Sequence, residues 1–172
     1  MAFALIIVLL VVAVILGMRT NKHIKRLDAR CESAWEALND QLERRNALIP
    51  RIAEGVDAQS ADQSEAISYL MRMQAAVATA STPEARMSSS VELTSVLNTI
   101  ITSLEIPAEL REELEDIDVK LTYARATYNE CVHDYNTAIT TFPGRLIARF
   151  GFRPRQSFDA VGDTARHKAL AS

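Results

Sequence analysis

The chain has 172 residues, about one domain by length, and 48% of them are hydrophobic. Its formal net charge is −3 and its middle, residues 31–141, is acidic, so nucleic acid is not an expected partner, because a nucleic-acid-binding domain needs a basic stripe on its body. The only cysteines, Cys31 and Cys131, form no disulfide framework. Both fall on apolar faces of expected helices, where we expect buried free thiols.

Residues 1–18 contain no polar side chain. As a helix they span about 27 Å, close to the roughly 30 Å thickness of the hydrocarbon layer. A cleaved signal peptide would have basic residues before the apolar run and a small-residue cleavage site after it, and neither is present. We therefore predict that residues 1–20 are a transmembrane anchor.

Residues 21–142 predict a bundle of four helices. The first continues from the anchor to near Ser60, with a kink or a new start near Pro50. The second covers 62–80 and the third covers 83–104, with Thr82 as N-cap, Pro83 in the first helical position and a weak turn at 88–90. The fourth begins at Pro107 and ends near Thr141. Nothing in the sequence between these helices suggests β-structure.

The fourth helix has the most regular pattern in the chain, an apolar stripe with steps of three and four residues. A stripe of this length needs partner helices along all of it, because packing supplies most of the stability of a helix. The stripe consists of Leu110, Leu114, Ile117, Leu121, Ala124, Tyr128, Cys131, Tyr135, Ala138 and Phe142.

The helix lengths and short connections predict an all-α fold in which an N-terminal transmembrane helix continues into an elongated antiparallel four-helix bundle. Charge is distributed unevenly along it. Residues 19–30 carry five basic side chains and one acidic one, and residues 142–172 carry six and two, whereas residues 31–141 carry eight and nineteen. If the last long helix returns to the bilayer, the two basic segments meet at its surface. The positive-inside rule, applied to the basic residues 19–30 that follow the anchor, places the N-terminus outside and residues 19–172 in the cytoplasm.

Polar residues interrupt the expected core at Gln41 and Arg45. Because buried amides and charges need partners, we expect these two side chains to meet Asn129, Tyr135 or Asn136 of the fourth helix in one polar layer. Such a layer would fix helix register, or alternatively form a ligand site or an oligomer contact.

The basic, aromatic segment 143–172 has two open interpretations. Its phenylalanines either cap the open end of the bundle or lie at the membrane surface or a subunit contact. The residues expected at a membrane or subunit contact are Arg19, Lys22, Lys25, Arg26, Arg145, Arg149, Phe150 and Phe152. Exposed basic residues near anionic lipid headgroups contribute about 1 kcal/mol each.

No pattern in the sequence predicts catalysis. It has no His-Glu-x-x-His, no Glu-x-x-His pair of the di-iron bundles and no glycine-rich phosphate loop. Cys131 and His133 are two residues apart and so point to different sides of a helix. We therefore expect no enzyme activity, no metal and no cofactor.

Two segments resemble the signatures of the LemA family. One runs from Ala124-Arg125-Ala126-Thr127-Tyr128-Asn129 through Phe142-Pro143-Gly144 to Leu146-Ile147-Ala148 and Phe150-Gly151-Phe152. The other runs from Ala34-Trp35 through Gln41-Leu42 and Arg44-Arg45 to Leu48-Ile49-Pro50. Residues 60–108 are the least similar. The resemblance implies a single-pass protein of the bacterial cytoplasmic membrane with an antiparallel helical bundle, and in one branch of the family a part in building an organelle membrane.

We therefore expect a self-associating membrane scaffold at the cytoplasmic face, with the lipid bilayer and further copies of the chain as partners. The alternative is an adaptor that recruits another protein, such as a membrane protease, through the acidic bundle surface.

Overall fold

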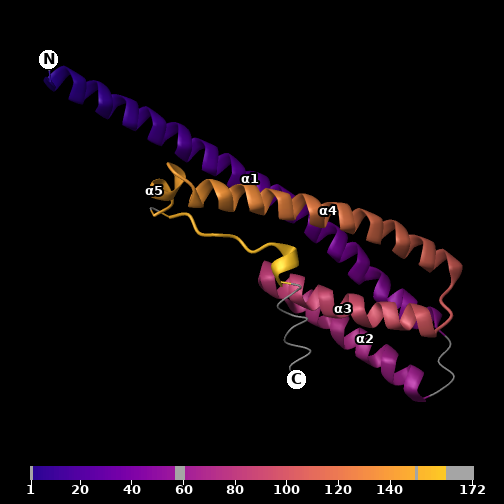
Figure 1. Ribbon diagram of the computed structural model, residues 1–172. Coiled ribbons are helices and arrows are strands. Elements are labelled where there is room, and N and C mark those ends of the chain that lie inside the picture. The colour runs from indigo at the N-terminus through magenta and orange to yellow at the C-terminus, as the bar shows by residue number, and fades with distance from the viewer. Residues whose placement is uncertain (1, 57–60, 150, 162–172) are drawn as a thin grey trace.

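The computed structural model describes residues 2–56, 61–149 and 151–161. Its elements are the helices α1 (Ala2–Gly55), α2 (Ala61–Thr79), α3 (Pro83–Ser103), α4 (Ala108–Thr140) and α5 (Gly144–Ala148) (Figure 1). No strand occurs among these residues, so the all-α prediction is confirmed.

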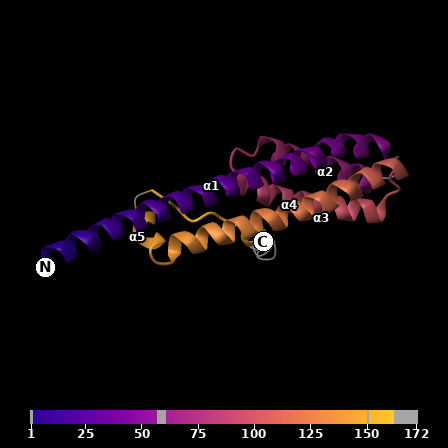
Figure 2. The same cartoon turned by 90° about the horizontal axis from the view of Figure 1, so that it is seen from above.

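Helix α1 is both the apolar N-terminal segment and the first helix of the folded domain. Among the described residues, it is the one helix long and apolar enough to cross a membrane, and none of its most apolar window is buried. It extends well beyond the rest of the molecule at the N-terminus (Figures 1 and 2). The helix continues through Pro50 to Gly55, so Pro50 does not begin a new segment as one of the two expectations had it.

Helix α4 lies beside α1 in both views (Figures 1 and 2). An added Cβ at Gly55 would lie 3.0 Å from Pro107, and one at Gly144 would lie 3.5 Å from Ile24. The end of α1 therefore lies beside the start of α4, and the middle of α1 lies beside the end of α4. Between them, the Trp35 ring lies 5.7 Å from the Tyr128 ring.

Helices α2 and α3 pack against each other, and α2 also packs against α1, at the end far from the N-terminus. The predicted inward residues Leu93, Leu97, Ile100 and Leu104 are all buried. Thr82 accepts a hydrogen bond from the Ala85 amide at 3.2 Å, which confirms the predicted N-cap. The weak turn predicted at 88–90 is absent, because α3 continues through it and Ser90 is buried.

Two apolar clusters make up the core. One lies towards the N-terminal side and joins α1 and α4 to the C-terminal residues Phe158 and Val161. The other joins α1 and α4 to α2 and α3. The stripe of α4 faces these clusters as predicted except at its last member, since Phe142 is 83% exposed and Ile139 is buried in its place. Phe142 follows the end of α4, so helical spacing no longer sets its direction.

Candidate functional site

Arg45 is the buried polar residue that the sequence predicted, but its partners are different. It is 3% exposed, and its Nη2 donates to the Ser90 carbonyl at 3.1 Å and to Ser90 Oγ at 2.8 Å. Its Nη1 lies 3.6 Å from Asp118 Oδ1, near enough for an ion pair but not for a good hydrogen bond. The Ser90 carbonyl already accepts a bond from Thr94 Oγ1. Arg45 therefore links α1 to α3 and α4 at one level of the molecule.

Burial governs the ionisation of this group. Removal from water lowers the pKa of the Arg45 guanidinium and raises the pKa of the Asp118 carboxyl, while their attraction opposes both shifts. Within the described residues, Arg45 Nε and Asp118 Oδ1 have no hydrogen-bond partner. The arrangement is thus an incompletely compensated buried charge.

The predicted single polar layer is wrong. Gln41 donates to its neighbour Asp40 at 2.9 Å and does not reach α4 through a hydrogen bond among the described residues. The helix register explains the difference, because Trp35 lies against Tyr128 and Arg45 lies opposite Asp118. Asn129 therefore lies about three helical turns from Asp118, too far for Arg45 to reach.

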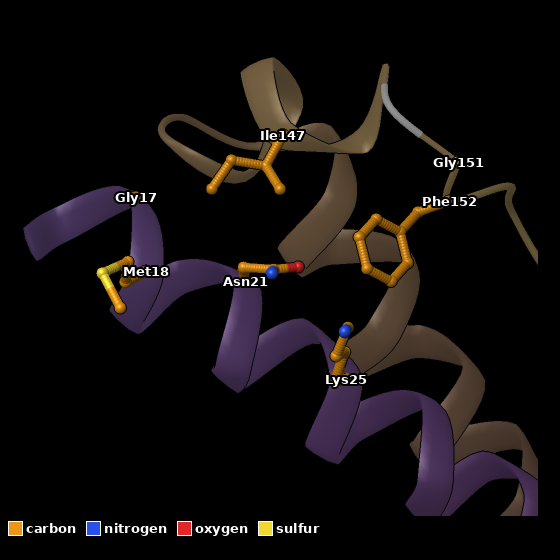
Figure 3. A pocket seen from close by; sticks show the side chains of 7 residues that line it. All are labelled: Gly17, Met18, Asn21, Lys25, Ile147, Gly151 and Phe152. Carbon is orange, nitrogen blue, oxygen red and sulfur yellow. The ribbon is translucent and has the colours of Figure 1, made fainter. Parts of the chain in front are cut away.

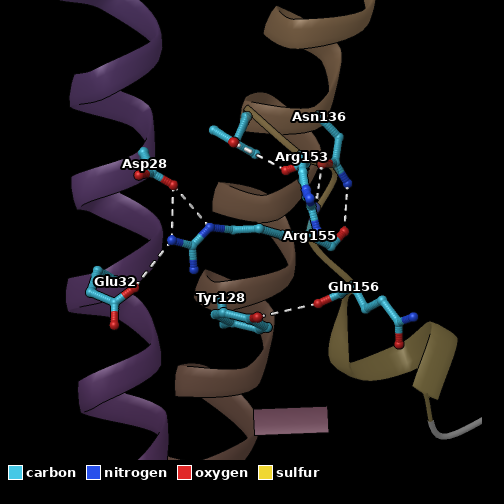
Figure 4. Close-up of polar contacts among 8 residues, drawn as sticks. Asp28, Glu32, Tyr128, Asn136, Arg153, Arg155 and Gln156 are labelled. Atoms are coloured by element: carbon cyan, nitrogen blue, oxygen red, sulfur yellow. Dashed lines mark hydrogen bonds and ion pairs between the residues drawn. The ribbon is translucent and has the colours of Figure 1, made fainter. Parts of the chain in front are cut away.

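The two tyrosine–asparagine pairs of α4 have a different role, since they hold the extended chain that follows α5 (Figure 4). We call residues 152–158 the C-terminal strap. Tyr128 donates to the Gln156 carbonyl at 3.2 Å and Tyr135 to the Arg153 carbonyl at 3.1 Å. The paired asparagines, Asn129 and Asn136, bind the strap as well.

Asn136 donates to the Arg155 carbonyl at 2.8 Å and accepts from the Arg155 amide at 2.9 Å, so one side chain satisfies both backbone groups. Asn129 accepts from the Phe158 amide at 2.8 Å. Residues 152–157 of the strap are extended with no strand beside them in the described part of the chain, and these side chains supply the bonds that a neighbouring strand would provide.

An ion pair ties the same strap to α1 (Figure 4). The Arg155 Nη2 lies 2.8 Å from Asp28 Oδ1 and 3.1 Å from Glu32 Oε2, and the guanidinium lies over the Tyr135 ring at 5.8 Å. Burial lowers the pKa of Arg155, but the hydrogen bonds and charges of Asp28 and Glu32 outweigh it, so its pKa is raised. Arg155 is therefore a permanent cation between α1 and α4.

Sequence reasoning missed Asp28, Glu32, Arg155, Ser90 and Asp118 as parts of polar contacts. Asp28 gave one usable signal, since it is the single acid in the basic run 19–30. The others resemble ordinary surface residues, and only the register of the helices reveals their partners.

The basic residues fall into two groups. Most of those away from the anchor are paired with an acid, as Arg51 is with Glu113 and Arg86 with Glu43. Within the described residues, no ion pair forms at a group of bases near the end of the apolar span, and all of these are exposed: Arg19, Lys22, Lys25, Arg26, Arg30, Arg145, Arg149 and Arg153. We call this group the basic collar.

Helix α5 brings the two halves of the basic collar together, because it packs against both α1 and α4. A groove of about 510 Å³ lies between the two chain segments (Figure 3). Gly17, Met18, Asn21 and Lys25 line it from α1, and Ile147, Gly151 and Phe152 from the other side. Of the predicted contact residues, Lys25 and Phe152 thus face each other, whereas Phe150 lies outside the described residues.

The two cysteines and the possible metal ligands do not point to a reactive site in the described part of the chain. Cys31 and Cys131 are free and buried as predicted, and burial raises the pKa of the Cys31 thiol to about 11, which makes it a poor nucleophile. Among the described residues, no three His, Cys, Asp or Glu side chains gather into a potential metal site.

Comparison with known proteins gives one result. A family model described as LemA family matches residues 34–170, which is most of the chain and includes the least similar stretch 60–108. No curated protein matches the sequence.

Proposed function

The chain belongs to the LemA family, and we propose that it is a membrane-anchored, self-associating helical scaffold that organises or remodels the bilayer at whose surface it lies. In this proposal α1 crosses the bacterial cytoplasmic membrane once, with the N-terminus outside. Residues 21–142, which include the rest of α1 together with α2, α3 and α4, form an elongated antiparallel four-helix bundle in the cytoplasm. The contacts of Gly55 with Pro107 and of Ile24 with Gly144 support this arrangement.

The observation that carries the proposal is the basic collar, which lies where the apolar span of α1 ends. Exposed cations without acidic partners keep their full charge for an external anion, and the cytoplasmic leaflet of a membrane supplies anionic headgroups. The turn around α5 adds exposed apolar side chains at the same level, since Phe142 is 83% exposed and Leu146 is 54% exposed. Arginine interleaved with exposed apolar residues is typical of a membrane interface.

A vesicle-binding experiment tests the contact with lipid. The fragment 20–172, checked for helical content by circular dichroism, is expected to sediment with vesicles containing phosphatidylglycerol. The double substitution Arg145→Glu and Arg149→Glu should weaken sedimentation, whereas the distal Arg72→Glu with Arg111→Glu should have little effect. Equal binding by both double variants would count against the collar as the membrane contact.

Self-association is the second part of the proposal. The outward face of α4 exposes Val119 at 71% and Tyr123 at 77%, one helical turn apart, which is an apolar pair suited to a neighbouring copy. Cryo-electron microscopy of the full chain in detergent or nanodiscs tests it. Oligomeric particles are expected, and strictly monomeric particles at high concentration would overturn the scaffold.

The adaptor is the alternative function. It is favoured by Glu109, Glu112 and Glu115 of α4, which are exposed and form no ion pair within the described part of the chain. A pull-down with residues 31–141 distinguishes the two. A stoichiometric partner protein that is lost on Glu112→Lys with Glu115→Lys favours the adaptor over the scaffold.

A further inference from the structure

The groove between α1 and α5 has the form of a binding site for a single amphipathic molecule. Its wall on α1 changes from apolar to charged over two helical turns, from Gly17 and Met18 through Asn21 to Lys25. The opposite wall is apolar, with the Ile147 and Phe152 side chains directed towards α1 (Figure 3). Its volume of about 510 Å³ lies within the usual range of small-molecule sites.

The position of the groove identifies its occupant. Gly17 and Met18 are the last residues of the run that contains no polar side chain, so the apolar end of the groove faces the acyl-chain region of a bilayer. Met18 is 69% exposed, which leaves this end of the groove open to the side. A water-soluble ligand would gain little from contact with an apolar wall at that depth, whereas a lipid acyl chain would bury apolar surface against it.

The polar end of the groove offers a cation and an amide. Within the described residues, neither Lys25 nor Asn21 has a side-chain hydrogen bond or ion pair, so both keep their donors for a ligand. The Lys25 ammonium, with its three donors, suits a phosphate oxygen. Arg26 and Lys22 of α1 do not line the groove and add a positive field beside it.

Gly17 lines the apolar end of the groove. An added Cβ at Gly17 would meet no atom within 4 Å, so this position has room for a larger side chain. Because Gly17 lines the groove, a larger side chain there adds bulk at its apolar end.

We propose that the groove between α1 and α5 binds one anionic phospholipid, with its phosphate on Lys25 and Asn21 beside Phe152, and with the adjoining part of one acyl chain along Met18 and Ile147. This site rests on the proposed function, since it needs α1 in a membrane. It adds a specific site to the diffuse attraction of the basic collar. A bound lipid here would join α5 to α1 at the bilayer surface.

Native mass spectrometry of the full chain in a neutral detergent tests the site, with titration by phosphatidylglycerol or by phosphatidylcholine of the same acyl chains. The native chain is expected to retain one phosphatidylglycerol in preference. Lys25→Gln should weaken retention about five-fold, the effect of one cation near a headgroup. Gly17→Leu, which fills the groove, should remove the preference although it leaves every charge in place.

Two control variants separate the site from the collar. Arg26→Gln removes the same charge beside the groove, and Ala13→Leu adds bulk one turn deeper in the span, so both should retain the lipid as the native chain does. Helical content by circular dichroism should be the same for all variants. Equal losses with Lys25→Gln and Arg26→Gln would overturn the specific site and leave the membrane-surface contact of the proposed function standing. Unchanged retention in Gly17→Leu would also overturn it.

Discussion

The two ends of the α1–α4 pair differ in whether their basic side chains have acidic partners. At the end far from the anchor, Arg45, Arg51 and Arg86 each have an acidic partner on another helix or on a neighbouring segment. At the end near the anchor, the basic collar has no such partner within the described residues. Arg155 is the exception there, since Asp28 and Glu32 both neutralise it.

The difference separates structural charges from charges that are available to a ligand. Paired charges fix the register of helices, and exposed pairs add little to stability. Unpaired cations, grouped beside an apolar span, gain only from an external anion. The distal end is therefore the part of the molecule that keeps α1, α3 and α4 aligned, and the proximal end is the part that we propose contacts lipid.

The largest expected effect is a loss of stability at the proximal end, where α4 and α5 meet α1. A Cβ on Gly144 would lie 1.9 Å from the Ala138 carbonyl oxygen, a backbone atom that cannot move aside easily. Gly144→Ala should therefore lower the free energy of unfolding by about 3 kcal/mol, the upper end for overpacking. Thermal unfolding in detergent, followed by circular dichroism, measures it. Gly17→Ala, which has open space inside α1, is the matched control and should not lower the midpoint.

The next largest effect is a loss of stability at the distal end, where Arg45 is buried. Arg45→Ala removes two hydrogen bonds to Ser90 and leaves a cavity, so we expect a loss of about 2–3 kcal/mol in the free energy of unfolding. Urea unfolding in detergent, followed by the fluorescence of Trp35, measures it. Arg45→Met should recover much of the loss, because an apolar side chain of similar length removes the buried charge. Arg44→Ala, at an exposed position, should cost about 0.5 kcal/mol or less.

A smaller effect concerns the C-terminal strap. Asn136→Ala leaves the Arg155 amide and carbonyl without their partner, at a cost of about 1–2 kcal/mol that is confined to the strap. Hydrogen exchange should speed up about five- to thirty-fold at the Arg155 amide and remain unchanged in α2. Asn98→Ala, at an exposed position on α3, is the control. Equal exchange rates in the native chain and Asn136→Ala would show that the strap is held by other contacts.

The smallest effect is a pH dependence at the distal end. Burial raises the pKa of Asp118 above its ordinary value of 3.8, so the folded chain binds this proton more tightly than the unfolded chain does. This contribution to stability is complete below the ordinary pKa and is lost as the pH rises through the raised one. Asp118→Asn should flatten that part of the curve of unfolding free energy against pH. The exposed Asp116→Asn should preserve it.

Much of the fold was predictable because it depends on local patterns. The apolar spacing of α4 predicted its buried face, and Thr82 predicted the start of α3, since capping involves only the nearest backbone amides. Phe142 shows the limit of such patterns. Its spacing continued the stripe, but α4 ends at Thr140 and the side chain is exposed.

The candidate site was only partly predictable. The sequence identified Arg45 as a polar residue in the core, which the structure confirms, and it proposed the tyrosine–asparagine pairs of α4 as its partners. It assigned them to each other, and the structure assigns Arg45 to Ser90 and Asp118 and the pairs to the C-terminal strap. The error is one of register, because a shift of a few helical turns leaves every apolar face intact and exchanges every polar partner.

The sequence by itself determined the apolar N-terminal span, the helices and the location of positive charge, because each depends on residues close together in the chain. Only the tertiary structure decided which acids neutralise which bases. It paired Arg155 with Asp28 and Glu32 across more than a hundred residues and placed Lys25 beside Phe152, with no ion pair to any described residue. Ion pairs between helices depend on axial register and on the path of the chain after α5, and neither can be deduced from periodicity alone.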